Sequence, residues 1–395
     1  MPVSEPAAMS RPKIVLIGGD GGYSGVPRYL LQMVKALRDR ADITVVSDVN
    51  EGGFDALRGS GARHLTVHGL KTSGSPARGL RALLALRAIL GSGRPDLIWA
   101  HSRMAVLLLR LLLLRPGFGG QYAVTHHSLP FERGYPQPYA TLLRWWEAVM
   151  IRIVAPHHIL FLTETARRHY CAAMPASALR RHSLHVLNNC SDLGPWPVME
   201  RLDAAARVLV MTGRDSHQKN LRAALQLFAH LPENYRLVLC GAGTDQPAFQ
   251  AALDRILDRE QQARVDLRGP LPDVRPVLAT AAGYLLTSRY EGVPIGAIEA
   301  WEAGLPLALS RIDGTADILQ RHPLALPLDL TVPWQDLAVQ ARALDEMISR
   351  YLSDQTGWRA AIQRAWAEQH SHAAWSEQLR AVLSLMLKKG PGCGD

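Results

Sequence analysis

The sequence predicts an α/β fold made of two doubly wound parallel-sheet domains. Three observations lead to this prediction: the chain has 395 residues, short apolar runs alternate with amphipathic runs, and the alternation stops and restarts once. Single hydrophobic cores rarely grow beyond about 250–300 residues, so a chain of this length is expected to divide. Strands that alternate with helices favour parallel sheets covered by helices. We therefore expect domains at residues 1–194 and 195–395, facing each other across a ligand cleft.

The first half of the chain contains five predicted strands. They are short, rich in β-branched residues and separated by segments of helical periodicity such as PRYLLQMVKALRDR. The expected ranges are 13–19, 43–47, 96–102, 122–128 and 158–164. The following segment LGPWPVME supplies two prolines and a change of polarity, which places the connection between the domains near residue 195.

The second half repeats the pattern. Strands are expected at residues 206–213, 235–243, 264–269 and 283–288, with a helix beginning at about Asn220. After the last of these strands, RYEG forms a turn and IGAIEAWEAG forms a helix. Pro294 suits the first position of that helix, and Gly304 and Pro306 end it. The last helix of the chain is expected to pack back on the first domain.

Composition narrows the class of protein. The chain is 48% hydrophobic and 20% charged, which is typical of a globular protein. Its four cysteines are far apart, so neither a zinc site nor a disulfide framework is indicated, and this fits a cytoplasmic protein. No signal peptide is apparent at the N-terminus. The longest apolar run, residues 104–114, is interrupted by Arg110 and is too short to span a bilayer.

The charge is uneven along the chain. Residues 1–194 carry a net charge of +11 and residues 195–395 carry −2. No nucleic-acid-binding pattern accompanies the basic half, so nucleic acid is not the expected partner. Two interpretations stay open: an arginine-rich solvated surface, or docking of GLRALLALRAIL and RWWEAVMIRIV on an anionic membrane. The alternative for these two stretches is that their apolar faces belong to the core.

Two glutamates in the segment SRYEGVPIGAIEAWEAGLP suggest a ligand. Glu291 and Glu299 are eight residues apart, which corresponds to about 12 Å along a helix, so they do not form an acid/base pair. The backbone amides of Gly292, Val293, Pro294 and Ile295 lie at a helix N-terminus; three of these residues carry an N–H that can bind an anion. Carboxylates accept hydrogen bonds from vicinal hydroxyls. A nucleotide sugar combines phosphates with such hydroxyls.

The same segment resembles the E-x7-E motif of retaining glycosyltransferases with the GT-B fold, and the chain is similar to glycosyltransferase family 4 over nearly its whole length. Other matching motifs, in chain order, are YSGVPRYLLQMVKAL, DLIWAHS, VTHHS, VLNNCSD and TGRDSHQKN. The resemblance implies two Rossmann-like domains and sugar transfer from a nucleoside diphosphate sugar with retention at the anomeric carbon. It also implies no metal and no cofactor. UDP is the first expected nucleotide and GDP the second.

The resemblance implies a role for individual residues. Arg214 and Lys219 would neutralise the leaving diphosphate, and Lys219 is the only lysine between residues 72 and 387. Glu299 would hold the ribose hydroxyls and Glu291 the hydroxyls of the donor sugar. His127 would reach the donor sugar or its phosphate, with His126 as the competing assignment.

Further donor contacts are expected from the first loop and from one strand end. Gly25 and Arg28 would meet the diphosphate, and Gly25 would allow a close backbone approach. Backbone groups around Arg268 to Leu271 would hold the base. Gly241 and Gly243 are interpreted as a tight turn, because the third glycine of a dinucleotide-binding motif is missing.

The sequence departs from the family pattern at two points, and it leaves the acceptor open. Cys190 follows Asn189 where the family usually has glycine, so a positive-φ turn there would be strained. Pro27 stands in the first loop where glutamate is common. We expect a lipid-linked or saccharide acceptor and a role in cell-envelope polysaccharide or lipopolysaccharide assembly. A nucleotide-sugar epimerase and a non-catalytic nucleotide-sugar-binding protein stay open as alternatives.

Overall fold

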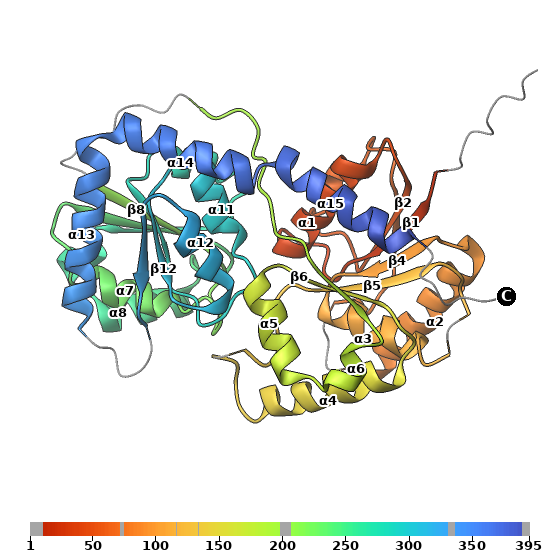
Figure 1. Cartoon of the computed structure of the whole chain (residues 1–395). Helices are drawn as coiled ribbons and strands as arrows, with labels where there is room; N and C mark the ends of the chain where they lie inside the picture. Colours follow the sequence, from red (N-terminus) through yellow and green to blue (C-terminus); the bar gives the residue numbers. More distant parts are fainter. Residues whose placement is uncertain are drawn as a thin grey trace, which may run out of the picture.

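The structure is a computed structural model, and it describes residues 11–71, 75–115, 117–132, 134–197, 207–330 and 336–388. It has two lobes, each a parallel sheet with helices on both faces (Figure 1). This confirms the predicted fold class. The described part of the first lobe holds a seven-stranded sheet and that of the second a six-stranded sheet.

The first sheet has the strand order β3-β2-β1-β4-β5-β6-β7. Its strands are β1 Lys13–Ile17, β2 Asp42–Ser47, β3 Arg63–Thr66, β4 Leu97–Ala100, β5 Gln121–His126, β6 His158–Phe161 and β7 Ser183–Val186. Its helices are α1 Gly25–Leu37, α2 Pro76–Gly93, α3 Arg103–Leu112, α4 Tyr139–Ile153, α5 Glu164–Ala173 and α6 Ala176–Leu179, with a 3-10 turn η1 at Asp55–Leu57. The strand order changes direction between β1 and β4, so the loops after these two strands open a crevice.

The second sheet has the order β10-β9-β8-β11-β12-β13. Its strands are β8 Arg207–Thr212, β9 Tyr235–Cys240, β10 Val265–Gly269, β11 Gly283–Leu286, β12 Leu307–Ser310 and β13 Ala325–Leu328. The helices that follow them are α7 Leu221–Phe228, α8 Pro247–Ile256, α9 Arg259–Gln262, α10 Arg275–Ala279, α11 Ile295–Glu302, α12 Ala316–Arg321, α13 Leu337–Ser353, α14 Gln355–Gln369 and α15 His372–Leu387, with a 3-10 turn η2 at Asp313–Thr315. The order changes direction between β8 and β11.

The C-terminal helix α15 lies against α1 of the first lobe (Figure 1). The ring of Trp375 meets the ring of Tyr29 at 5.4 Å between centroids, and the His372 imidazole lies 3.3 Å from the carbonyl of Gln32. Trp375 is fully buried. The two lobes are therefore joined at α15 as well as at the connection that follows β7.

The connection after β7 is tied to the second lobe by hydrogen bonds. The Asn189 amide donates to the carbonyl of Val293 at 2.9 Å, and the Leu193 N–H donates to Glu302 Oε1 at 3.0 Å. Cys190 is buried and does not have a positive φ. The strain anticipated there is therefore absent, because the chain passes Cys190 in a conformation that any residue adopts. Residues 198–206 lie outside the described residues.

Arg110, which interrupts the longest apolar run, is buried in the first lobe and pairs with Glu147 of α4. Tyr170 donates a hydrogen bond to the other oxygen of the same carboxylate. Burial alone would raise the pKa of Glu147, but the Arg110 charge outweighs it and holds that pKa well below its usual value. The pair is thus ionised within the core.

Candidate functional site

The candidate site lies where the strand order of the second sheet reverses. The loops after β8 and β11 meet there, and α11 begins immediately beyond the second loop. Pro294 was predicted to be the first helical residue, but it is the N-cap residue. The helix begins one residue later, at Ile295. The first turn of α11 contains no acidic residue, so its N-terminal amides and helix dipole can face an anion.

Glu291 is held in front of this helix by three side chains. Lys219 Nζ lies 2.7 Å from Glu291 Oε1, and Ser288 donates to the same oxygen at 2.8 Å. Gln218 donates to Oε2 at 3.2 Å. The carboxylate is 7% exposed, so its orientation is fixed by these contacts rather than by solvent. The structure therefore brings together two of the predicted catalytic residues, Lys219 and Glu291.

Glu299 lies inside α11 and meets the first lobe. Its Oε1 accepts a hydrogen bond from Arg28 Nη1 at 2.5 Å, although the two residues are 271 positions apart. Glu299 is 2% exposed; burial raises the pKa of its carboxyl, and the charge of Arg28 opposes this. A Cβ added to Gly25 would lie 3.5 Å from Ile295. The N-termini of α1 and α11 thus face each other across the cleft.

His127 and His126 have different surroundings, although they are adjacent at the end of β5. The His126 ring packs on Phe161 and lies 3.3 Å from Glu147, within the buried Arg110 cluster. The His127 backbone lies against the second lobe: a Cβ added to Gly292 would fall 1.5 Å from the carbonyl oxygen of His127. This geometry favours His127 over His126 as the residue at the cleft.

His101, at the end of β4, contacts His127 and was not singled out from the sequence. The two imidazoles approach to 3.5 Å between His127 Nε2 and His101 Nδ1. Burial lowers the pKa of His127 to about 3 and that of His101 well below its usual value, so both rings are neutral at pH 7. Tyr29 packs edge-on against His127 at 4.9 Å between centroids. These contacts fix the orientation of His127.

Two glycines allow close approaches around the site. Any side chain at Gly292 would collide with the His127 backbone. A Cβ added to Gly213 would come within 3.0 to 3.2 Å of three carbons of Lys219, so the glycine gives the lysine stem room to reach Glu291. Gly241 and Gly243 lie in a turn after β9, as predicted, with Thr244 N–H donating to the Gly241 carbonyl at 3.2 Å.

Other predicted residues lie at the margin of this centre. Arg214 is exposed on the loop that carries Lys219. Arg268 is exposed at the carboxyl end of β10 and pairs with Asp266 at 2.7 Å, and Leu271 is partly buried against the core. The structure does not join Arg268 or Leu271 to Glu291 or Glu299 by any contact between described side chains.

Glu132 is a second residue that the sequence analysis missed. It lies in the loop between β5 and α4 and is 8% exposed, and its Oε1 accepts from the Leu129 N–H at 2.7 Å. Burial raises the pKa of Glu132 to about 8, and the charges of Asp313 and Glu291 add to this effect. Glu132 belongs to none of the motifs recognised in the sequence, so the sequence alone does not single it out.

Within the described residues, no three His, Cys, Asp or Glu side chains are grouped to hold a metal ion. The same residues include no helix with the length and hydropathy needed to cross a bilayer.

The centre offers helix N-terminal amides, a lysine, an arginine, two buried carboxylates and a neutral imidazole. Amides and cations can bind phosphates, and carboxylates can bind sugar hydroxyls.

Comparisons with known proteins agree with this arrangement. Residues 23–194 match the family model described as Glycosyltransferase Family 4, and residues 198–327 match the model described as Glycosyl transferases group 1. The two matches fall on the first and second lobes. The lipopolysaccharide core biosynthesis glycosyltransferase LpsE of Rhizobium meliloti (strain 1021) is 25% identical over 173 residues, 43% of this chain. That match spans 48% of LpsE, about half of its length.

Solved structures show the same fold. HepE from Anabaena, crystallised with UDP and glucose, superposes with a TM-score of 0.72 at 14% identity, covering 95% of this chain and 100% of HepE. Sucrose-phosphate synthase from Thermosynechococcus elongatus gives 0.74 at 17% identity, covering 95% and 99%. With both lobes matched by family models and by complete two-lobed structures, this chain belongs to glycosyltransferase family 4 and has the GT-B fold.

Proposed function

We propose that this protein is a retaining glycosyltransferase that transfers a sugar from a nucleoside diphosphate sugar to an acceptor hydroxyl. The observation that carries the proposal is the pair of contacts around the N-terminus of α11: Lys219 with Glu291, and Arg28 with Glu299. UDP is the proposed nucleotide, with GDP second, and the UDP bound to the structurally similar HepE supports this choice. The proposed context is cell-envelope polysaccharide or lipopolysaccharide assembly, which the similarity to LpsE supports.

The proposed donor lies with its diphosphate against the amides of residues 292–295. Lys219 and Arg214 supply positive charge to the diphosphate, and Arg28 supplies it from the first lobe. Glu299 accepts hydrogen bonds from the ribose hydroxyls. Arg28 then donates to a donor phosphate in place of part of its hydrogen bonding to Glu299. Backbone groups near Arg268 and Leu271 hold the base at the end of β10.

The proposed reaction breaks the bond between the anomeric carbon and the phosphate oxygen. A bond from the acceptor oxygen forms on the same face of the sugar, and the acceptor proton passes to the departing phosphate oxygen. Glu291 holds the donor sugar hydroxyls, and the neutral His127 imidazole offers a hydrogen bond across the cleft. We propose that the protein cations and the α11 dipole stabilise the leaving group without a metal ion.

The test is turnover of a panel of UDP, GDP, ADP and dTDP sugars in EDTA, with release of the nucleoside diphosphate as the readout and a short saccharide as acceptor. The proposal predicts release that depends on one nucleotide and falls at least about a hundredfold in Glu291→Gln. NMR of the product would show the donor's anomeric configuration. Inversion would refute retention, an epimerised sugar would indicate the epimerase alternative, and binding without turnover would indicate a non-catalytic protein.

We further propose that the protein works at the cytoplasmic face of an anionic membrane and takes a lipid-linked or saccharide acceptor there. Helix α4 exposes a large apolar side chain at Tyr139, Leu142, Trp145 and Ile153, each at least half exposed. Exposed arginines on the same helix can bind anionic lipid headgroups. The acidic residue of this helix, Glu147, is buried with Arg110 and so does not repel those headgroups at the surface.

Sedimentation with vesicles of anionic and of neutral lipid tests this docking. Wild type is expected to bind anionic vesicles at low salt, and Trp145→Ala is expected to weaken binding several-fold. Val339→Ala, which removes an exposed apolar residue from α13 in the second lobe, serves as the matched control. Absence of wild-type binding would contradict the proposal.

A further inference from the structure

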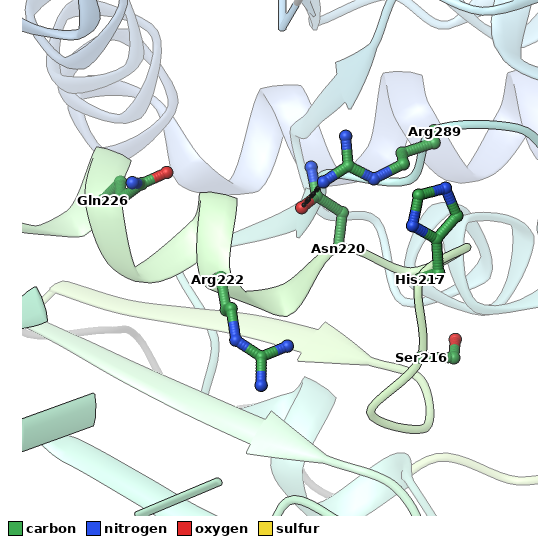
Figure 2. A pocket seen from close by; sticks show the side chains of 6 residues that line it. All are labelled: Ser216, His217, Asn220, Arg222, Gln226 and Arg289. Carbon is green, nitrogen blue, oxygen red and sulfur yellow. Dashed lines mark hydrogen bonds between the residues drawn. The ribbon is translucent and has the colours of Figure 1, made fainter. Parts of the chain in front are cut away.

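A cavity of about 410 Å³ lies near the Glu291 centre, and none of its lining residues contacts the donor in the proposed arrangement. Its lining comes from three elements: the loop after β8, helix α7 and the loop after β11. The lining residues are Ser216, His217, Asn220, Arg222, Gln226 and Arg289. Figure 2 shows Asn220, Arg289 and His217 close together, with Arg222 and Gln226 projecting from α7 apart from this group. This volume is within the range of small-molecule sites.

The lining of the cavity is cationic. Arg289 Nη2 donates to the neutral Asn220 amide oxygen at 2.9 Å, and its buried Nε has no hydrogen-bond partner among the described residues. No ion pair joins Arg289 to a carboxylate in the described part of the chain. Arg222 is about half exposed and lies 3.6 Å from Asp215, beyond ordinary hydrogen-bond length. Arg222 and Asp215 thus form a long ion pair, and the charge of Arg289 is left without a carboxylate partner among the described residues.

The N-terminus of α7 adds to this field. Asn220 is its N-cap residue but makes no capping hydrogen bond, because its side-chain oxygen accepts from Arg289 instead. The first turn of α7 contains no acidic residue. The positive end of the helix dipole and the two arginines therefore favour a ligand with a negative charge.

The cavity is distinct from the proposed diphosphate site but adjoins it. Gln218 and Lys219 turn to Glu291, whereas Ser216 and Asn220 of the same loop line the cavity. The Arg289 N–H donates to the Gln218 carbonyl at 2.8 Å, so the two loops form a shared wall.

The first lobe also reaches this wall, because a Cβ added to Gly134 would lie 2.5 Å from the Arg289 carbonyl oxygen. All six lining residues belong to the second lobe. The first lobe therefore contacts the backbone of one lining residue, Arg289, which stands two positions before Glu291 in the chain.

We propose that this cavity binds an anionic group, phosphate or carboxylate, carried by a saccharide acceptor. The proposal rests on the proposed function and adds the acceptor's chemical class. Arg289 and Arg222 bind the anion, and Asn220 and Gln226 offer hydrogen bonds to neighbouring hydroxyls. The hydroxyl that is glycosylated belongs to the sugar unit next to the anionic sugar unit. This neighbouring sugar then points toward Glu291.

The test uses the full chain with its donor site saturated by UDP. Glucose 6-phosphate and glucuronate are titrated as phosphate and carboxylate probes, and glucose is the neutral control. Binding of either anion at least about tenfold tighter than glucose is expected, and the stronger probe identifies the source of the charge. Arg222→Gln and Arg289→Gln are each expected to weaken anion binding about tenfold or more, as loss of a charge-assisted hydrogen bond implies.

Arg255→Gln removes the same charge from the exposed face of α8 outside the cavity and is the matched control. UDP affinity is expected to stay within about twofold in Arg222→Gln. The proposal is overturned if glucose binds as well as the anions, if neither cavity variant weakens them, or if excess UDP displaces them. Failure of wild type to bind UDP would refute the proposed function instead, and the anion titrations without UDP would still test the cavity.

Discussion

Replacement of Glu132 by glutamine is expected to change how stability depends on pH. Burial raises the pKa of Glu132 from 4.5 to about 8, with Asp313 and Glu291 adding to the shift and the Leu129 N–H and Arg103 opposing it. The folded protein therefore holds a proton at pH 7 that the unfolded chain releases. Stability consequently falls as pH rises from about 4.5 to about 8. Glu132→Gln keeps a neutral side chain and removes this contribution.

The magnitude follows from the two pKa values. Each pH unit between them costs about 1.4 kcal/mol, so the full shift corresponds to an upper limit of about 5 kcal/mol above pH 8. Relaxation of the surrounding groups around a buried charge makes the observed effect smaller than this limit. At pH 5 wild type and variant are expected to be similar, and at pH 9 the variant is expected to be more stable.

The assay is urea unfolding of both proteins from about pH 5 to about pH 9, compared by midpoint because a two-lobed protein need not unfold in one step. The midpoint difference between Glu132→Gln and wild type should grow with pH and level off above pH 8. Glu260→Gln, on the exposed helix α9, controls for the change of charge and should show no such trend. A difference that is constant with pH would refute the assignment of a raised pKa to Glu132.

Three further predictions test the packing around the site and the core. Gly292→Ala places a methyl group against the His127 carbonyl, so the lobes should separate locally, and small-angle scattering should show an expanded molecule; unchanged dimensions would contradict this close approach. Arg110→Met leaves Glu147 buried without its cation and should destabilise the fold by about 3 to 5 kcal/mol, most of which Arg110→Met with Glu147→Leu should recover. Equal stability of the single and double variants in chemical denaturation would contradict that account. His101→Phe keeps ring packing but removes the nitrogen facing His127, so kcat should fall while KM for the donor is unchanged; a change in KM alone would contradict a positioning role.

Most buried strands were predictable from the sequence because both of their faces are apolar, but β12, which is buried at all four positions, was not among the expected strands. The ranges expected for β1, β2 and β8 agree with the structure within two residues at each end. The edge strands β3 and β7 were missed because RHLT and SLHV are partly exposed and contain polar residues. β13 contains Pro327, which weakens a strand pattern and is tolerated at the edge of the sheet.

The site was predictable where one loop or helix carries its residues. Glu291 and the helix after it follow from the turn and capping pattern of a single segment, and the helix end at Gly304 is as predicted, with φ +76°. The pairing of Arg28 with Glu299 depends on how two lobes meet, which no local pattern encodes. The same holds for His101 beside His127, since two separate strands bring them together.

The most direct test of the account is the affinity for UDP in EDTA, measured for wild type, Lys219→Met and Glu299→Gln. The account predicts that wild type binds UDP without a metal ion. Each substitution should weaken binding at least about tenfold, because each removes a charged hydrogen-bonding partner of the nucleotide. Equal affinity in all three proteins would contradict the placement of the donor at the N-terminus of α11.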